Sequence, residues 1–273
     1  METTCMLPVK RFLAVTILIL AMISPASAGV VKVAGSGGMI PLVTELAKGY
    51  MAKQRGVTVE VNQNSLGKEG GVLALNKGLI DIAMMSTVSG QDRRLPFEFH
   101  PLAVVPSLFG VHPSVTVKKL TSQQVCDIYS GKIRNWKELG GPDAPIVVLT
   151  RPENESAKIA IREGLPCFRT LTETSTALSL AKSKHMVTTL EKTPYAIGML
   201  NTVLLDEAKG KIVAPDFDGL SVASMNPAKW PMKVTSYLAT RKNPPSAVAS
   251  FISFTKSAEG KKIIRRENGI PVD

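Results

Sequence analysis

The sequence predicts an α/β fold built on a parallel β-sheet. Apolar patterns typical of strands at residues 30–34, 57–61 and 79–85 alternate with two helical patterns. Because each connecting helix returns the chain to the same end of the sheet, strands in this order run parallel. A further apolar run at 146–149 precedes a polar loop and another helical pattern, which extends the α/β organisation into the second half of the chain.

The N-terminus has the pattern of a secretory signal peptide. The basic residues 10–11 precede an apolar run at 12–23, and small residues follow at 26–28. The apolar run is too short to span a bilayer. Cys5 lies ahead of this run, so it cannot be the acylated cysteine of a lipoprotein signal. We therefore expect residues 1–28 to be cleaved from a soluble, exported protein.

Charge composition favours a small anionic ligand. The chain carries a formal charge of +11, and removing Lys10, Arg11 and Glu2 takes away a net +1, which leaves about +10. Aromatic residues make up only 5%, and there is no Lys/Arg tract of the kind that binds nucleic acid. We therefore expect no nucleic-acid partner. The C-terminal basic residues are interpreted as one solvated helix face: Lys261, Lys262, Arg265 and Arg266.

Cysteine and histidine spacing predicts neither a metal site nor a cofactor. Cys126 and Cys167 have no metal-ligand spacing with His100, His112 or His185. In an oxidising compartment the two cysteines could form a disulfide or remain as buried thiols, and the sequence leaves both open.

Single residues delimit several of the expected elements. Pro41 suits the first turn of a helix that ends before Gly56. Residues 121–124 have the spacing of a capping box, and Gly131 suits the end of that helix. Trp136 is interpreted as a packing residue. The remaining expected elements are a strand at 102–111 interrupted by Pro106, helices at 155–165, 172–184 and 187–191, strands at 195–200 and 234–240, and helices within 245–266.

Three polar or glycine-rich loops follow the first three strands, at residues 36–38, 65–71 and 86–89. In a parallel sheet these loops share the carboxyl edge, where ligands of open α/β sheets bind. The glycines either allow a ligand to approach the backbone or only form tight turns. The turn at 35–38 lacks the spacing of a dinucleotide fingerprint or a P-loop.

The stretch from Arg151 to Ser156 contains the parts of an anion site. It follows a strand and precedes a helix, so a guanidinium lies near unpaired N–H groups and the positive end of a helix dipole. The alternative is an ordinary strand–helix junction that binds nothing.

Several motifs resemble a known family. They are Gly35-Ser36-Gly37-Gly38, the run 81–86, the run 128–136 that continues to Asp143, Ala196-Ile197-Gly198, and the run 257–264. Together they resemble the phosphate-binding proteins of bacterial phosphate ABC transporters. The resemblance covers nearly all of the chain after residue 28, and the segment 129–143 is its most specific part.

The resemblance implies a two-lobed type 2 periplasmic-binding-protein fold. Each lobe would be a mainly parallel sheet flanked by helices, and two crossing strands, near 104–113 and 234–240, would join the lobes. The implied division places residues 29–112 and 234–273 in one lobe and residues 113–233 in the other.

The resemblance also implies which residues bind the ligand, although some of these positions depart from the family's pattern. They are Ser36, Gly37, Gly38, Lys68, Gly70, Gly71, Ser86, Thr87, Arg151, Glu155 and Ser156. Thr87 stands where the family has an acidic residue or an arginine. In the family the acidic residue accepts the proton of hydrogen phosphate. Ala157 stands where the family has a threonine. Lys68 either supplies charge to the ligand or pairs with Glu69 or Glu155.

The expected function is a periplasmic solute-binding protein that captures phosphate or a similar tetrahedral oxyanion for an ABC permease. We expect a monomer and no enzymatic activity. The degenerate motifs leave a phosphonate, molybdate or an organic anion as alternatives. An exported hydrolase has less support, because Ser36 and Ser156 lack a nucleophile-elbow pattern and the histidines lack triad partners. A scaffold that binds no ligand also stays open.

Overall fold

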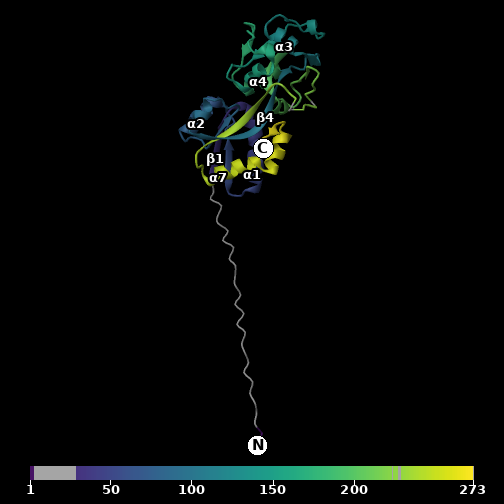
Figure 1. Ribbon diagram of the computed structural model, residues 1–273. Coiled ribbons are helices and arrows are strands. Elements are labelled where there is room, and N and C mark those ends of the chain that lie inside the picture. The colour runs from purple at the N-terminus through teal and green to yellow at the C-terminus, as the bar shows by residue number, and fades with distance from the viewer. Residues whose placement is uncertain (3–28, 223, 227–228, 273) are drawn as a thin grey trace.

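The computed structural model describes residues 1–2, 29–222, 224–226 and 229–272 (Figure 1). The predicted signal peptide falls almost wholly outside these residues. None of the described helices is long and apolar enough to cross a membrane. Two groups of elements, which we call the first and second lobes, lie at opposite ends of β4 in Figure 1.

The first lobe is a parallel sheet with helices on both faces. Its strands are β1 (Gly29–Gly35), β2 (Val57–Val61) and β3 (Ile82–Met85). Its helices are α1 (Ile40–Lys53), α2 (Gly67–Asn76), α7 (Ser246–Lys256) and α8 (Ala258–Arg266), with short 3-10 turns η1 (Gly37–Met39) and η2 (Asp92–Arg94). Because β1 pairs in parallel with both β2 and β3, the predicted parallel sheet is confirmed.

The second lobe repeats the α/β organisation. Its strands are β6 (Val147–Thr150), β7 (Leu178–Ser179) and β8 (Ala196–Asn201). Its helices are α3 (Ser122–Tyr129), α4 (Ser156–Gly164), α5 (Ser183–Lys192) and α6 (Thr202–Glu207), with 3-10 turns η3 (Trp136–Leu139) and η4 (Pro166–Phe168). β6 pairs in parallel with β7 and β8. The short strands β5 (Lys119–Leu120) and β9 (Asp216–Phe217) form a separate pair.

Two long strands connect the lobes. β4 (Phe97–Val111) and β10 (Lys233–Arg241) are antiparallel, and the sheet order is β2-β1-β3-β10-β4-β8-β6-β7, with β11 (Ile270–Pro271) also on β4. The expected interruption at Pro106 is wrong, since β4 runs through it. Pairing with β10 ends at Pro106 and pairing with β8 begins at Ser107. The proline therefore lies where β4 changes partner, at a position that tolerates a missing N–H donor.

The expected helix at residues 172–184 is also wrong. This segment contains β7, which pairs with β6, and α5 begins only at Ser183. The carboxylate of Glu173 contacts the buried Lys158, so tertiary contacts hold the segment extended. By contrast, the capping box of α3 forms as predicted, with Thr121 and Gln124 bonding reciprocally.

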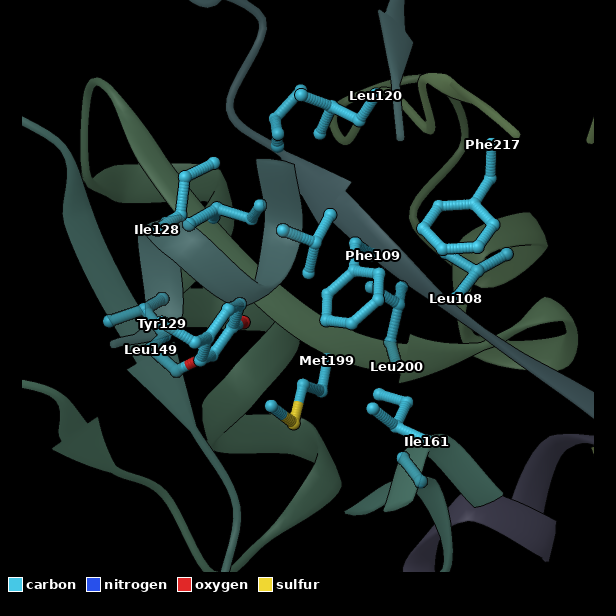
Figure 2. Packing of buried hydrophobic residues seen from close by; sticks show 14 of the residues in the cluster. Leu108, Phe109, Leu120, Ile128, Tyr129, Leu149, Ile161, Met199, Leu200 and Phe217 are labelled. Atoms are coloured by element: carbon cyan, nitrogen blue, oxygen red, sulfur yellow. The ribbon is translucent and has the colours of Figure 1, made fainter. Parts of the chain in front are cut away.

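Each lobe has its own hydrophobic core. In the second lobe Phe109, Tyr129 and Phe217 pack among aliphatic side chains (Figure 2). Trp136 is fully buried in the same core, which confirms its packing role. Helix α6 belongs to both cores, because Val203 packs in the first lobe and Leu204 in the second. The lobe boundaries at 112/113 and 233/234 stay a prediction.

A disulfide joins Cys126 on α3 to Cys167 in η4, which decides between the two alternatives left open above. It closes a loop with a sequence separation of 41 residues. Restricting the unfolded chain over a loop of this size stabilises a protein by about 2–4 kcal/mol. We expect Cys126→Ala/Cys167→Ala to lower the free energy of unfolding by this amount in urea titrations. A loss that persists when both proteins are compared under reducing conditions would contradict the assignment.

Candidate functional site

The loops after β1 and β3 meet at the carboxyl edge of the first lobe. The Ser36 hydroxyl donates to the Ser86 hydroxyl and accepts from the Ser86 backbone N–H, both at 3.2 Å. Ser36 is buried and directly precedes the turn that carries Gly37 and Gly38 into α1. The predicted convergence of these two loops is therefore confirmed.

Glycine allows the backbone to pack closely at this edge. Gly35 has φ +145°, and a Cβ there would lie 2.3 Å from the Met84 carbonyl oxygen. A Cβ on Gly71 would lie 2.8 Å from Cα of Gly35. Gly71 thus lets α2 approach β1, which is a packing role. A Cβ on Gly70 would lie 3.0 Å from Cβ of Leu66 on its own loop.

Lys68 is held by a partner that the sequence did not suggest. Its Nζ lies 3.0 Å from Oδ2 of Asp92, and neither Glu69 nor Glu155 takes that place. Burial tends to raise the pKa of Asp92, but hydrogen bonds from Ser89 and Lys68 hold it below its usual value. Lys68 and Thr87 line a side cavity of about 610 Å³, whose opposite wall includes Ile159 of α4.

A small central cavity lies between the lobes at the crossing strands. It brings together Gly38 and Ser86 from the first lobe and Ser156 from the start of α4. The rest of the lining is both polar and apolar: Met39 in η1, Val105 and Ser107 on β4, Asn201 at the end of β8, and Val234 and Ser236 on β10. The Asn201 amide also donates to the Gly38 carbonyl at 3.3 Å, which links the two lobes.

Ser107, Asn201 and Ser236 were missed at the level of sequence. All three are buried. A polar residue within an otherwise apolar strand is a signal that could have identified Ser107 and Ser236, because buried polar groups need partners. Asn201 gives no comparable signal. Its side chain caps α6 by accepting a hydrogen bond from the Leu204 N–H, and this role alone accounts for an asparagine at that position.

Arg151 lies beneath the loop that leads from β6 into α4. Its side chain is only 3% exposed, and its Nη2 contacts the Glu155 carboxylate and the Ser183 hydroxyl, the latter at 3.4 Å. Its Nε and Nη1 are buried and have no partner among the described residues. Buried donors of a charged group are costly without acceptors. The two free donors lie on different edges of the guanidinium, so each needs an acceptor of its own, such as an oxygen of a bound oxyanion.

Two helix starts adjoin this guanidinium. Ser156 begins α4, whose N-cap residue Glu155 makes no side-chain cap, and Ser183 begins α5. First-turn N–H groups and the helix dipole favour anions at such positions. Ser183 is a further residue that the sequence did not identify, because the segment before it was predicted as continuous helix.

A buried ion pair between Lys158 and Glu173 lies next to the segments that carry Arg151 and Ser183. Lys158 is completely buried, and its Nζ contacts the Glu173 carboxylate and lies 2.8 Å from the Thr150 hydroxyl. Thr150 directly precedes Arg151, and Glu173 lies in the segment that leads to Ser183. The pair therefore connects β6, α4 and the approach to α5.

Two of the histidines in the described part of the chain have partners other than the candidate nucleophile serines. His100 bonds to Thr240 and His112 bonds to Ser114, rather than to Ser36 or Ser156. Among the described residues no group of histidine, cysteine, aspartate and glutamate could hold a metal ion.

Comparison with known proteins agrees with this architecture. The family model of the PBP superfamily domain matches residues 22–261. The phosphate-binding protein PstS of Bacillus subtilis is 26% identical over 256 residues, covering 90% of this chain and 82% of that protein. The phosphate-binding protein PstS of Borreliella burgdorferi is 23% identical over 257 residues, covering 87% of this chain and 88% of that protein.

Solved structures show the same fold. One from Clostridium perfringens, described as a phosphate ABC transporter substrate-binding protein with bound phosphate, has a TM-score of 0.78 and 27% identity, covering 89% of this chain and 100% of that one. An ABC-type phosphate transport receptor from Vibrio cholerae has a TM-score of 0.62 and 23% identity, covering 89% and 100%.

Proposed function

Since this chain belongs to the PBP superfamily, we propose that it captures phosphate or a similar tetrahedral oxyanion between its two lobes. The observation that carries this proposal is Arg151, whose buried guanidinium holds two donors without partners among the described residues. The hydroxyls and amides of the central cavity supply further neutral donors. The similarity to phosphate-binding relatives supports the same class of ligand.

The proposed function also implies how the bound anion reaches the cell. The bound anion would be delivered to a membrane ABC permease from the periplasm, after export by the signal peptide, and the protein would act as a monomer. The lobes, divided at 112/113 and 233/234, would close over the ligand by bending at β4 and β10, as in other hinged binding proteins. No catalytic step is part of this role.

A different anion is the second candidate, and one observation favours it. Lys68 is engaged by Asp92, and Lys68 and Thr87 line the side cavity rather than the central cavity. Together with Ala157, this arrangement removes donors expected at a phosphate site. A phosphonate, molybdate or organic anion would then replace phosphate on Arg151.

Isothermal titration of the purified protein with phosphate, arsenate, sulfate and molybdate tests the proposal. We expect phosphate and arsenate to bind with one site per chain. Absence of heat with all four anions, in protein that circular dichroism shows to be folded, would overturn it. Binding of molybdate with no response to phosphate would select the second candidate.

Glu155 is expected to set selectivity for a protonated anion. Its carboxylate contacts Arg151 and can only accept hydrogen bonds, so it favours a ligand that donates a proton, such as hydrogen phosphate, over sulfate. In Glu155→Gln we expect sulfate affinity to rise about tenfold, a change of ~1.4 kcal/mol. Glu163→Gln, an exposed change on the same helix, is the matched control. Unchanged sulfate rejection in Glu155→Gln would contradict this role.

A further inference from the structure

A second cavity adjoins the Gly37–Gly38 turn and opens between the lobes. It has a volume of about 390 Å³. Residues of the turn and of the β2–α2 loop form one wall, and the start of α5 forms the other. We call it the basic pocket and define it by Gly37, Ser65, Lys182, Lys184, His185 and Thr188.

The basic pocket has a positive charge that the protein itself does not neutralise. Among the described residues that line it, none is acidic. Lys182 and Lys184 are exposed, and across the described residues neither forms an ion pair. Lys68, which lines the side cavity, differs from these two lysines because it forms an ion pair with Asp92. Unpaired cations on the wall of a cleft attract anionic groups.

Only Ser183 and the Gly37–Gly38 turn lie between this pocket and Arg151 in the contacts described below. Ser183 contacts the Arg151 guanidinium at 3.4 Å. A Cβ on Gly37 would lie 3.6 Å from Cβ of Ser183. A Cβ on Gly38 would lie 3.7 Å from the hydroxyl oxygen of Ser183. Gly37 lines the basic pocket while Gly38 lines the central cavity. The Arg151 guanidinium is therefore close to the pocket, with the Ser183 side chain and the Gly37–Gly38 turn between them.

From this arrangement we propose that the site takes phosphoryl compounds with a second anionic group, which Lys182 and Lys184 bind in the basic pocket. The inference rests on the proposed function, because Arg151 must first hold a phosphoryl group. Thr188 and Ser65 supply hydroxyls to the same space. A ligand with one charged group would leave the lysines without an anionic partner, whereas pyrophosphate carries a second charged group that they can attract.

Calorimetry with pyrophosphate, phosphate and glycerol 3-phosphate tests this inference. We expect wild-type protein to bind pyrophosphate more tightly than phosphate. In Lys182→Ala/Lys184→Ala, pyrophosphate affinity should fall about tenfold while phosphate affinity changes less than about threefold, since exposed charge pairs contribute modestly. Lys192→Ala, an exposed change at the other end of α5, is the control and should alter neither ligand.

The outcomes separate this inference from the proposed function. Binding of phosphate without tighter binding of pyrophosphate, or equal losses for both ligands in the double variant, overturns the second-anion inference and leaves the proposed function standing. Tighter binding of glycerol 3-phosphate than of pyrophosphate also overturns it, because that substituent has hydroxyls but no second charge. Absence of binding by phosphate and pyrophosphate alike overturns the proposed function itself.

Discussion

Replacing Arg151 with alanine is expected to abolish anion binding. Its Nε and Nη1 are the buried donors without partners among the described residues, and each hydrogen bond from a charged group contributes about 1.5–3 kcal/mol. Loss of two such bonds weakens affinity by at least about a hundredfold. Titration calorimetry with phosphate measures the loss. Arg151→Lys should recover only part of the affinity, because an ammonium is a compact point charge and cannot reproduce the planar set of guanidinium donors.

A stability measurement separates binding from folding in this variant. Removing Arg151 removes two unsatisfied buried donors, which is stabilising, but it also breaks the ion pair with Glu155, so the two effects oppose each other and we expect the variant to stay folded with only a modest change in melting temperature. Arg162→Ala is the matched control. Arg162 bonds to Glu153 and to the Phe168 carbonyl, so its loss should lower stability and leave binding intact. If Arg151→Ala binds the anion as tightly as wild type, the site lies elsewhere.

Lys158→Met is expected to lower the free energy of unfolding by about 3–5 kcal/mol. The substitution leaves the Glu173 carboxylate, which is only 14% exposed, without its main partner, and breaking a buried ion pair has a cost of this size. Urea titration measures the change. Lys158→Met/Glu173→Leu should recover most of the loss, because an apolar pair of similar volume replaces both charges.

The same substitution should also disturb the anion site. Glu173 precedes β7 and Ser183 in the chain, so loosening it frees the segment that places Ser183 against Arg151. We expect weaker phosphate binding in Lys158→Met and recovery in the double variant. A loss of stability below about 1 kcal/mol would show that the pair contributes little in this protein.

Local signals predicted the first lobe well. The alternation of strands and helices between residues 30 and 85 is encoded in side-chain periodicity, and β1, β2 and β3 pair in parallel accordingly. The capping box at Thr121 needs only two side chains three residues apart, so it forms as expected. The same kind of signal failed at residues 172–184, where β7 and the ion pair between Lys158 and Glu173 outweigh helix periodicity.

The candidate site was only partly predictable for the same reason. Ser36 and Ser86 could be brought together from sequence, because parallel strands share one carboxyl edge. The partner of Lys68 could not be predicted, since Asp92 is 24 residues away and meets it only through the fold. Ser107 and Ser236 lie on strands whose packing partners are distant in the chain, so their approach to Ser156 depends on the crossing of β4 and β10.

The sequence by itself determined the α/β class, the parallel order of the first strands, and Arg151 at a strand–helix junction as a candidate anion donor. These properties depend on residues a few positions apart, where periodicity and turn chemistry decide the structure. Only the tertiary structure decided the disulfide between Cys126 and Cys167, the engagement of Lys68 by Asp92, and the closeness of Ser183 to Arg151. Each depends on distances between segments that only the packed lobes bring together.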